Sequence, residues 1–259
     1  MVKTGYIHTD HGEVFYKKVN GKGDCGFLFI HGAGGDSRLY NWQMSFFENS
    51  KVCVAVDLPG HGSSPLRKPV SLQAYSEILL RVLDKLGIYH CIPVGHSMGG
   101  GIAFEMYRKM PEIFRGMVFI STGAVLPVSS VVFDLLAKDF DSLCELAVKL
   151  SYSSSASESV RSLAVEQLRE TGKELVTEDF RICSNFDYTA DCKNLDLPVL
   201  VIANSKDKMV PLDVSRSLEE ACPTARLEVI ESEGHMPHVE SHERVNQLLK
   251  EFIEGIDTC

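Results

Sequence analysis

A serine between glycines is the strongest chemical signal in the chain. The segment GHSMG at residues 95–99 follows an apolar run, 90–94, and opens a helix-prone segment, 98–109. In strand–turn–helix context this pattern places a serine on a sharp, strained turn where only small neighbours fit. The turn also exposes the free amides of a helix N-terminus, which favour developing negative charge. We therefore expect Ser97 to be a nucleophile, with an ordinary glycine-rich turn as the alternative.

A serine hydroxyl needs a base, because it is a poor nucleophile on its own near neutral pH. His235 is the best placed of the nine histidines. It follows an expected strand, 226–230, through a short loop that contains Gly234. It should therefore project from the same carboxyl edge of a sheet as Ser97. His238, three residues further on, is the alternative base.

The base in turn needs a carboxylate that fixes its tautomer and stabilises its charged form. Asp207 follows the apolar run 198–202 and should lie at the same edge. Asp213 is an alternative, although it falls within the next expected helix, 212–221. The turn after the run 116–120 reads STGA and offers no acid. The predicted set is therefore Ser97, Asp207 and His235.

A glycine-rich loop, HGAGG at residues 31–35, follows the apolar run 26–30. Acyl transfer needs backbone donors for the oxyanion, and we assign them to the amides of Ala33 and Met98. The loop lacks the Lys-Ser/Thr ending of a P-loop and is not GxGxxG, so nucleotide binding is not expected. Three neighbouring residues are expected to bind substrate: Gly32, Gly34 and His96.

Short apolar runs alternate with helix-prone segments along the chain. Residues 26–30, 51–56 and 90–94 are apolar at consecutive positions, as in strands covered on both faces. Residues 72–86 carry apolar side chains at three- and four-residue steps, which predicts an amphipathic helix. Other expected elements are an early antiparallel strand at 12–19, the strands 116–120, 198–202 and 226–230, and helices at 98–109, 212–221 and 243–253. This alternation predicts an α/β fold with a mostly parallel, doubly wound sheet.

One stretch, 124–189, breaks the alternation because it is helix-prone and poor in strands. A structureless loop of that length would be unusual inside a domain, whereas a helical insertion is not. We therefore expect residues 1–123 and 190–259 to form the core and residues 124–189 to form an inserted helical cap.

Composition narrows the classes of protein. The 259 residues are 44% apolar and 24% charged, as in ordinary globular domains, and the net charge of −9 argues against nucleic acid or anionic membranes as partners. No apolar run approaches the roughly 20 residues of a membrane span, and no signal-peptide pattern is evident at the start. Eight cysteines without a CxxC pair suggest mostly buried, reduced thiols in a cytoplasmic protein. No Cys/His cluster has metal-ligand spacing, so no metal is expected.

Five motifs in order resemble the α/β-hydrolase superfamily over nearly the whole chain. They are HGAGG, DLPGHGSS at 57–64, GHSMGG at 95–100, LPVLVIANSKDKMVP at 197–211 and EGHMPHVE at 233–240. The resemblance implies the α/β-hydrolase fold, a nucleophile–acid–base order along the chain and no cofactor. It also implies that the loop 57–64 is architectural and that the insertion is the cap domain of the family.

The expected function is that of a serine hydrolase that cleaves a carboxylic ester through an acyl-enzyme on Ser97. Apolar residues between 125 and 136 favour a small or medium apolar substrate if they line the pocket. Serine at the turn argues against haloalkane dehalogenases and epoxide hydrolases, which use aspartate. A thioesterase, a carbon–carbon bond hydrolase, a haloperoxidase-like enzyme or a lyase stays open, because fold does not choose among them. So does a small-molecule receptor that keeps the triad. A monomer or small homo-oligomer is expected.

Overall fold

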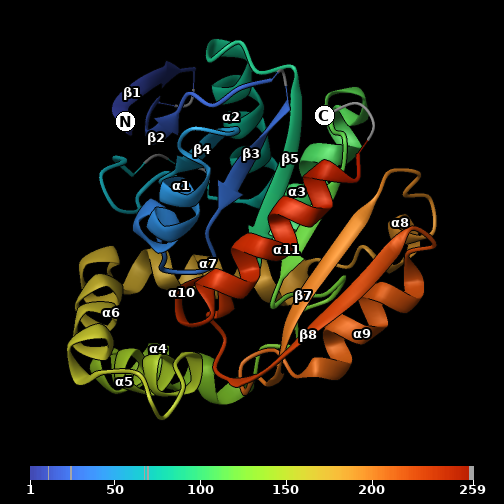
Figure 1. Cartoon of the computed structure of the whole chain (residues 1–259). Helices are drawn as coiled ribbons and strands as arrows, with labels where there is room; N and C mark the ends of the chain where they lie inside the picture. Colours follow the sequence, from blue (N-terminus) through green and yellow to red (C-terminus); the bar gives the residue numbers. More distant parts are fainter. Residues whose placement is uncertain (11, 24, 67, 69, 257–259) are drawn as a thin grey trace.

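The computed structural model describes residues 1–256 except 11, 24, 67 and 69. Within this part of the chain, one sheet has the strand order β1-β2-β4-β3-β5-β6-β7-β8 (Figure 1). The pairs β1–β2 and β2–β4 are antiparallel, and the pairs from β4 to β8 are parallel. The strands are β1 Lys3–Thr9, β2 Gly12–Val19, β3 Cys25–Ile30, β4 Val52–Val56, β5 His90–His96, β6 Met117–Ile120, β7 Val199–Lys206 and β8 Ala225–Glu233. The expected mostly parallel sheet is confirmed.

Helices cover both faces of this sheet because its strands are apolar on both sides. In β3, Leu28 and Ile30 belong to one core cluster, whereas Phe27 and Phe29 belong to the opposite cluster. The Leu28 cluster contains residues of α2, α3 and α9, and the Phe27 cluster contains residues of α1 and α11. The helices of the two faces and their connections are η1 Ser37–Tyr40, α1 Asn41–Phe47, α2 Leu72–Lys85, α3 Met98–Lys109, η2 Pro111–Ile113, α8 Thr189–Cys192, α9 Leu212–Ala221, α10 Pro237–Glu240 and α11 His242–Glu254. The sheet is doubly wound, as expected.

Four more helices lie between β6 and β7 in the sequence. They are α4 Ser130–Lys138, α5 Phe140–Ser151, α6 Glu158–Thr171 and α7 Lys173–Asn185, and we call them the inserted helices. Figure 1 shows α4, α5 and α6 gathered beyond the end of the sheet toward which β3 points. They have a small apolar cluster of their own that includes Leu136, Leu143, Val176 and Phe180. The inserted helices therefore lie at the carboxyl edge, where the predicted site residues emerge from the strands.

Several element bounds differ from the sequence-based expectation. Strand β7 continues to Lys206, so Asp207 follows it directly. Strand β1 and helix α1 were not anticipated. In the described part of the chain, no helix has both the length and the apolar character needed to cross a membrane. Six cysteines are buried free thiols, as expected, whereas Cys25 is disulfide-bonded, contrary to the expectation of reduced thiols throughout.

Candidate active site

Ser97 occupies the sharp turn between β5 and α3. Its backbone has φ 51° and ψ −119°, a conformation that residues with a side chain rarely adopt. A Cβ on Gly95 would lie 2.4 Å from the Gly99 carbonyl oxygen, and a Cβ on Gly99 would lie 2.3 Å from the Ile30 oxygen. The glycines of the GHSMG segment are thus required by close backbone packing on both sides of the serine.

Hydrogen bonds hold this turn in place. The Ser97 amide donates to the Ile120 carbonyl oxygen at 3.0 Å, which ties the turn to β6. The Ser97 carbonyl oxygen accepts from the Thr122 hydroxyl at 2.8 Å and from the Gly100 amide at 2.9 Å. These contacts leave the serine side chain to face the cavity described below.

His235 and Asp207 are joined by a hydrogen bond of 2.7 Å between Nδ1 and Oδ2. The Asp207 side chain is itself held, because its Oδ1 accepts from the amides of Met209 at 2.8 Å and Val210 at 3.0 Å. Both residues are buried. Since Nδ1 of His235 faces a carboxylate, the proton belongs on Nδ1 and Nε2 is left as an acceptor. That is the tautomer a general base needs.

Two further imidazoles surround His235. Nε2 of His96 donates to the His235 carbonyl oxygen at 2.9 Å, and the two rings lie 4.7 Å apart. Burial, followed by the neighbouring His238 and His235, lowers the pKa of His96 well below its usual range. Burial and His235 also lower the pKa of His238 to about 3, and its ring stacks on Tyr40. His238, the alternative base, is therefore a neutral, buried residue that packs against Tyr40.

Ser97 and His235 both line one cavity of about 200 Å³ beneath the inserted helices. Leu126, Val132 and Phe180 give the wall an apolar character, and Lys208 is the one Lys, Arg, Asp or Glu among the described lining residues. His96 and Gly34 also line this cavity, and their expected role in substrate binding stays a prediction. Such a wall favours an uncharged, apolar ligand with a single reactive polar group.

The glycine-rich loop after β3 supplies free backbone donors. The amides of Gly34 and Gly35 are engaged, by Asp179 Oδ2 at 2.9 Å and by the Gly32 oxygen at 3.1 Å. Within the described residues, neither the Ala33 amide nor the Met98 amide has an acceptor. Both are the amides assigned from the sequence as oxyanion donors.

Gly32 differs from the other expected substrate contacts. It is not among the described residues that line the cavity. A Cβ at this position would lie 3.0 Å from both His96 Nδ1 and the Cβ of Ser97. The absence of a side chain at Gly32 therefore permits the close approach of the glycine-rich loop to Ser97, and its expected contact with substrate stays a prediction.

A second histidine–carboxylate pair lies next to this site. His61 Nε2 and Asp179 Oδ2 are 2.8 Å apart, and both side chains are fully buried. Burial alone would lower the pKa of His61, but the Asp179 carboxylate outweighs it and the pKa is raised. From the sequence, His61 belongs to a loop expected to be architectural, and Asp179 is not among the expected site residues. The signal for Asp179 is its position within the apolar stripe of α7, between Leu175 and Cys183.

The site has the groups for acid–base and nucleophilic chemistry. Among the described residues, no three His, Cys, Asp or Glu side chains gather in a way that could hold a metal ion.

Comparisons with known proteins bear on the family and the fold. A family model described as "Alpha/beta hydrolase family" matches residues 27–248. The chain is 26% identical over 258 residues to a pimeloyl-(acyl-carrier protein) methyl ester esterase from Yersinia enterocolitica, covering 94% of this chain and 98% of that one.

Two solved structures extend the comparison. A structure titled as a thermophilic esterase has a TM-score of 0.88 and 25% identity, with 99% of each chain covered. A bromoperoxidase from Bacillus anthracis has a TM-score of 0.90 at 18% identity, covering 97% of this chain and all of that one. The second likeness shows the fold alone.

Replacing Asp207 tests the hydrogen bond that orients the base. In Asp207→Asn, the amide can donate to Nδ1 of His235 and favours the wrong tautomer. We expect kcat for a p-nitrophenyl ester to fall roughly 10³- to 10⁴-fold with little change in the melting temperature. Asp213→Asn, on exposed α9, removes the same charge away from His235 and should keep the activity of the unsubstituted chain. Equal rates in the two variants would contradict the assignment.

Because of the His61–Asp179 pair, we predict that the stability difference between the unsubstituted chain and a His61→Gln variant depends on pH. The groups facing it are His31, whose pKa lies at about 4, and Tyr75 and Cys183, whose pKa values burial raises. A raised pKa on His61 stabilises the fold fully below its ordinary value near 6.5, and this stabilisation is lost as pH rises through the raised value. We expect His61→Gln to cost about 3 kcal/mol or more in unfolding free energy at pH 5.5.

The difference in unfolding free energy between the unsubstituted chain and His61→Gln should be smaller at pH 9. It should fall by roughly 1.4 kcal/mol for each unit by which the pKa of His61 is raised. Urea unfolding of both proteins at the two pH values measures it. A gap that is constant with pH would show that His61 is not charged in the folded chain.

Proposed function

The chain belongs to the alpha/beta hydrolase family, and from this premise we propose that it is a serine esterase acting through an acyl-enzyme on Ser97. The observation that carries the proposal is the His235–Asp207 hydrogen bond of 2.7 Å at the wall of the cavity that Ser97 also lines. The free amides of Ala33 and Met98 support the same reaction, because acyl transfer needs donors for the oxyanion. The esterase among the relatives and the esterase among the similar structures add support.

The reaction proceeds in two halves. Nε2 of His235 takes the Ser97 proton as the serine oxygen attacks the ester carbonyl carbon, and the Ala33 and Met98 amides stabilise the oxyanion. The carbonyl re-forms as the bond to the alcohol oxygen breaks, and His235 gives its proton to that oxygen. Water then attacks the acyl-enzyme as His235 takes its proton, and the acid is released as His235 returns that proton to the Ser97 oxygen. Asp207 stabilises the charged imidazole in both halves.

The proposed substrate is a small to medium ester that is apolar in its acyl part. A cavity of about 200 Å³ is smaller than typical drug-sized sites of roughly 300–1,000 Å³. Its apolar lining supports burial of an aliphatic chain and gives no counter-ion for an acyl chain that ends in a cation. We also propose that residues 124–189 act as a cap over this cavity, supported by the contribution of Leu126, Val132 and Phe180 to its wall.

A cytoplasmic location is proposed as well. The six buried free thiols support a reducing environment, although the bonded Cys25 does not add to that support.

Removing the Ser97 hydroxyl tests the proposed nucleophile. We expect Ser97→Ala to fold normally and to lose p-nitrophenyl butyrate hydrolysis by roughly 10⁴- to 10⁶-fold, because the variant lacks the hydroxyl on which the proposed acyl-enzyme forms. A fluorophosphonate probe should label the unsubstituted chain at Ser97 alone, as read by peptide mass spectrometry. Ser155→Ala, at an exposed site in the turn between α5 and α6, is the matched control. Hydrolysis that survives in Ser97→Ala would overturn the assignment.

An ester chain-length panel tests the proposed size of the acyl site. We expect kcat/KM for p-nitrophenyl esters to be highest between acetate and hexanoate and to fall at least about tenfold by dodecanoate, because the longer chain exceeds the enclosed apolar volume. A continued rise toward long chains would show that the cavity opens much further on binding.

A further inference from the structure

We call residues 31–36 the oxyanion loop. Its first residue, His31, is neutral and ties the loop to the core. Its Nε2 accepts from the Leu58 amide at 3.0 Å, so its proton must lie on Nδ1, which donates to the Gly32 carbonyl oxygen at 2.8 Å. Burial, followed by the charge of His61, lowers the pKa of His31 to about 4, which agrees with a neutral ring. These bonds fix the first half of the loop to the architectural segment 57–64.

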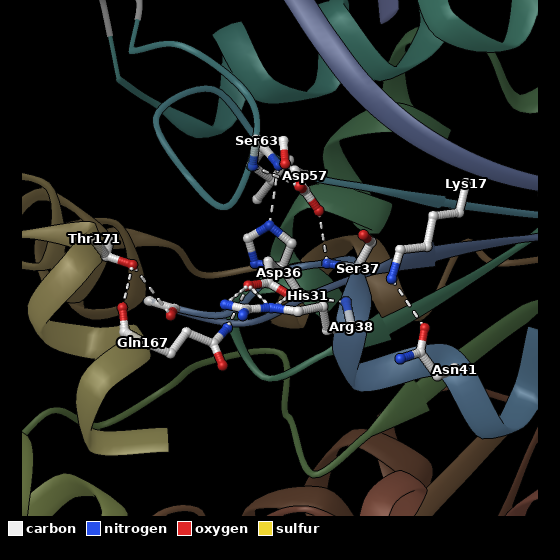
Figure 2. A network of polar contacts seen from close by, with 12 residues as sticks. Lys17, His31, Asp36, Ser37, Arg38, Asn41, Asp57, Ser63, Gln167 and Thr171 are labelled. Atoms are coloured by element: carbon white, nitrogen blue, oxygen red, sulfur yellow. Dashed lines mark hydrogen bonds and ion pairs between the residues drawn. The ribbon is translucent and has the colours of Figure 1, made fainter. Parts of the chain in front are cut away.

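Helix α6 reaches the second half of the loop from the other side. Figure 2 shows Gln167 and Thr171 on this helix, pointing toward the loop. Gln167 Nε2 donates to Asp36 Oδ2 at 2.9 Å, and Thr171 Oγ1 donates to the Gly34 carbonyl oxygen at 3.5 Å. Gly34 has φ +64°, and a Cβ there would lie 2.3 Å from Leu168 Cδ2. The loop and α6 are therefore in direct contact.

Helix α7 supplies the strongest contact from this side. Asp179 Oδ2 accepts from the Gly34 amide at 2.9 Å and from His61 Nε2 at 2.8 Å. Both hydrogen bonds of Asp179 Oδ2 are shielded from water, since His61 and Asp179 are fully buried. One carboxylate oxygen thus links the oxyanion loop, the segment 57–64 and the inserted helices.

We propose that Asp179 is a positioning residue for the oxyanion hole, which fixes the Gly34 amide and thereby directs the adjacent Ala33 amide at the substrate carbonyl. This inference rests on the proposed function. Neighbouring peptide planes share only two soft dihedral angles, so a fixed Gly34 amide restricts the direction of the Ala33 amide. The segment HGAGG has little stiffness of its own, and without an acceptor for Gly34 it would sample other conformations.

His61 offsets the free-energy cost of burying the Asp179 carboxylate. A carboxylate buried without a counter-ion is costly, and His61 supplies that counter-ion as well as a donor. Asp179 does not appear among the described lining residues of the cavity, whereas its neighbour Phe180 does. Loss of Asp179 should therefore slow the acylation step while leaving ground-state substrate binding nearly unchanged.

The test compares p-nitrophenyl acetate with its thionoacetate analogue. Sulfur accepts hydrogen bonds more weakly than oxygen, so the thionoester gains less from the oxyanion donors and the ratio of the two rates reports their alignment. In Asp179→Ala we expect kcat on the oxygen ester to fall roughly ten- to a hundredfold. KM should stay within about threefold, and the oxygen-to-sulfur rate ratio should fall at least about fivefold. Asp179→Asn keeps a carbonyl acceptor for Gly34 and should recover part of both losses.

Glu178→Gln is the matched control, because it removes a carboxylate one residue away that pairs with Arg181 at the surface. It should keep the rates and the ratio of the unsubstituted chain. An Asp179→Ala protein with an unchanged ratio, or one in which KM alone rises, overturns the proposal. Should Asp179→Ala fail to fold, Asp179→Leu, which is similar in size to aspartate and has no acceptor for the Gly34 amide, decides, and a ratio equal to that of the control overturns the proposal.

The two proposals fail in distinguishable ways. If the unsubstituted chain is not labelled at Ser97 by the fluorophosphonate, the esterase function itself fails, and this inference with it. If Ser97 is labelled and the ester is hydrolysed while the Asp179 variants match Glu178→Gln, only the positioning role is wrong.

Discussion

The left-handed backbone of Ser97 is the constraint on which the rest of the site depends. A residue with a side chain in such a conformation costs about 1–3 kcal/mol, which the surrounding structure must offset. Here the offset comes from bonds to Ile120 and Thr122 and from the packing of Gly95 and Gly99 against bare backbone. The same turn starts α3, so it also sets the direction of the Met98 amide. The proposed nucleophile and one proposed oxyanion donor are consequently placed by a single local conformation.

His235, the proposed base, depends on a separate set of contacts that converge on its ring and backbone. Asp207 is the carboxylate hydrogen-bonded to its ring, while His96 and His238 beside it are held neutral because their pKa values are lowered. Two neutral imidazoles do not oppose the positive charge that His235 acquires during the reaction. Burial therefore helps the base in two ways, by keeping water away from the Asp207 bond and by keeping neighbouring histidines uncharged.

Much of this arrangement could be predicted because the catalytic motifs and the helix patterns are short, local features of the sequence. The helices 98–109 and 212–221 have the expected bounds, because apolar periodicity defines them and nearby prolines and glycines mark their ends. Strand β1 was missed because it is an edge strand with one buried side chain, Ile7, and so lacks an alternating pattern. Helix α1 has seven residues and no side-chain cap, which leaves too little periodicity to detect. Asp179 pairs with His61 across 118 positions, and no local pattern encodes such a contact.

The inserted helices accept hydrogen bonds from backbone amides in both halves of the site. The Ser151 carbonyl oxygen at the end of α5 accepts from the His235 amide at 2.6 Å, and Asp179 on α7 accepts from the Gly34 amide. The first bond is made to the loop that carries the base, and the second to the loop that carries an oxyanion donor. A displacement of these helices as a unit would therefore loosen base and donor together, while Ser97, held by β5, β6 and α3, would keep its strained turn. Because these two hydrogen bonds come from α5 and α7, the positions of His235 and of the Gly34 amide depend on the inserted helices.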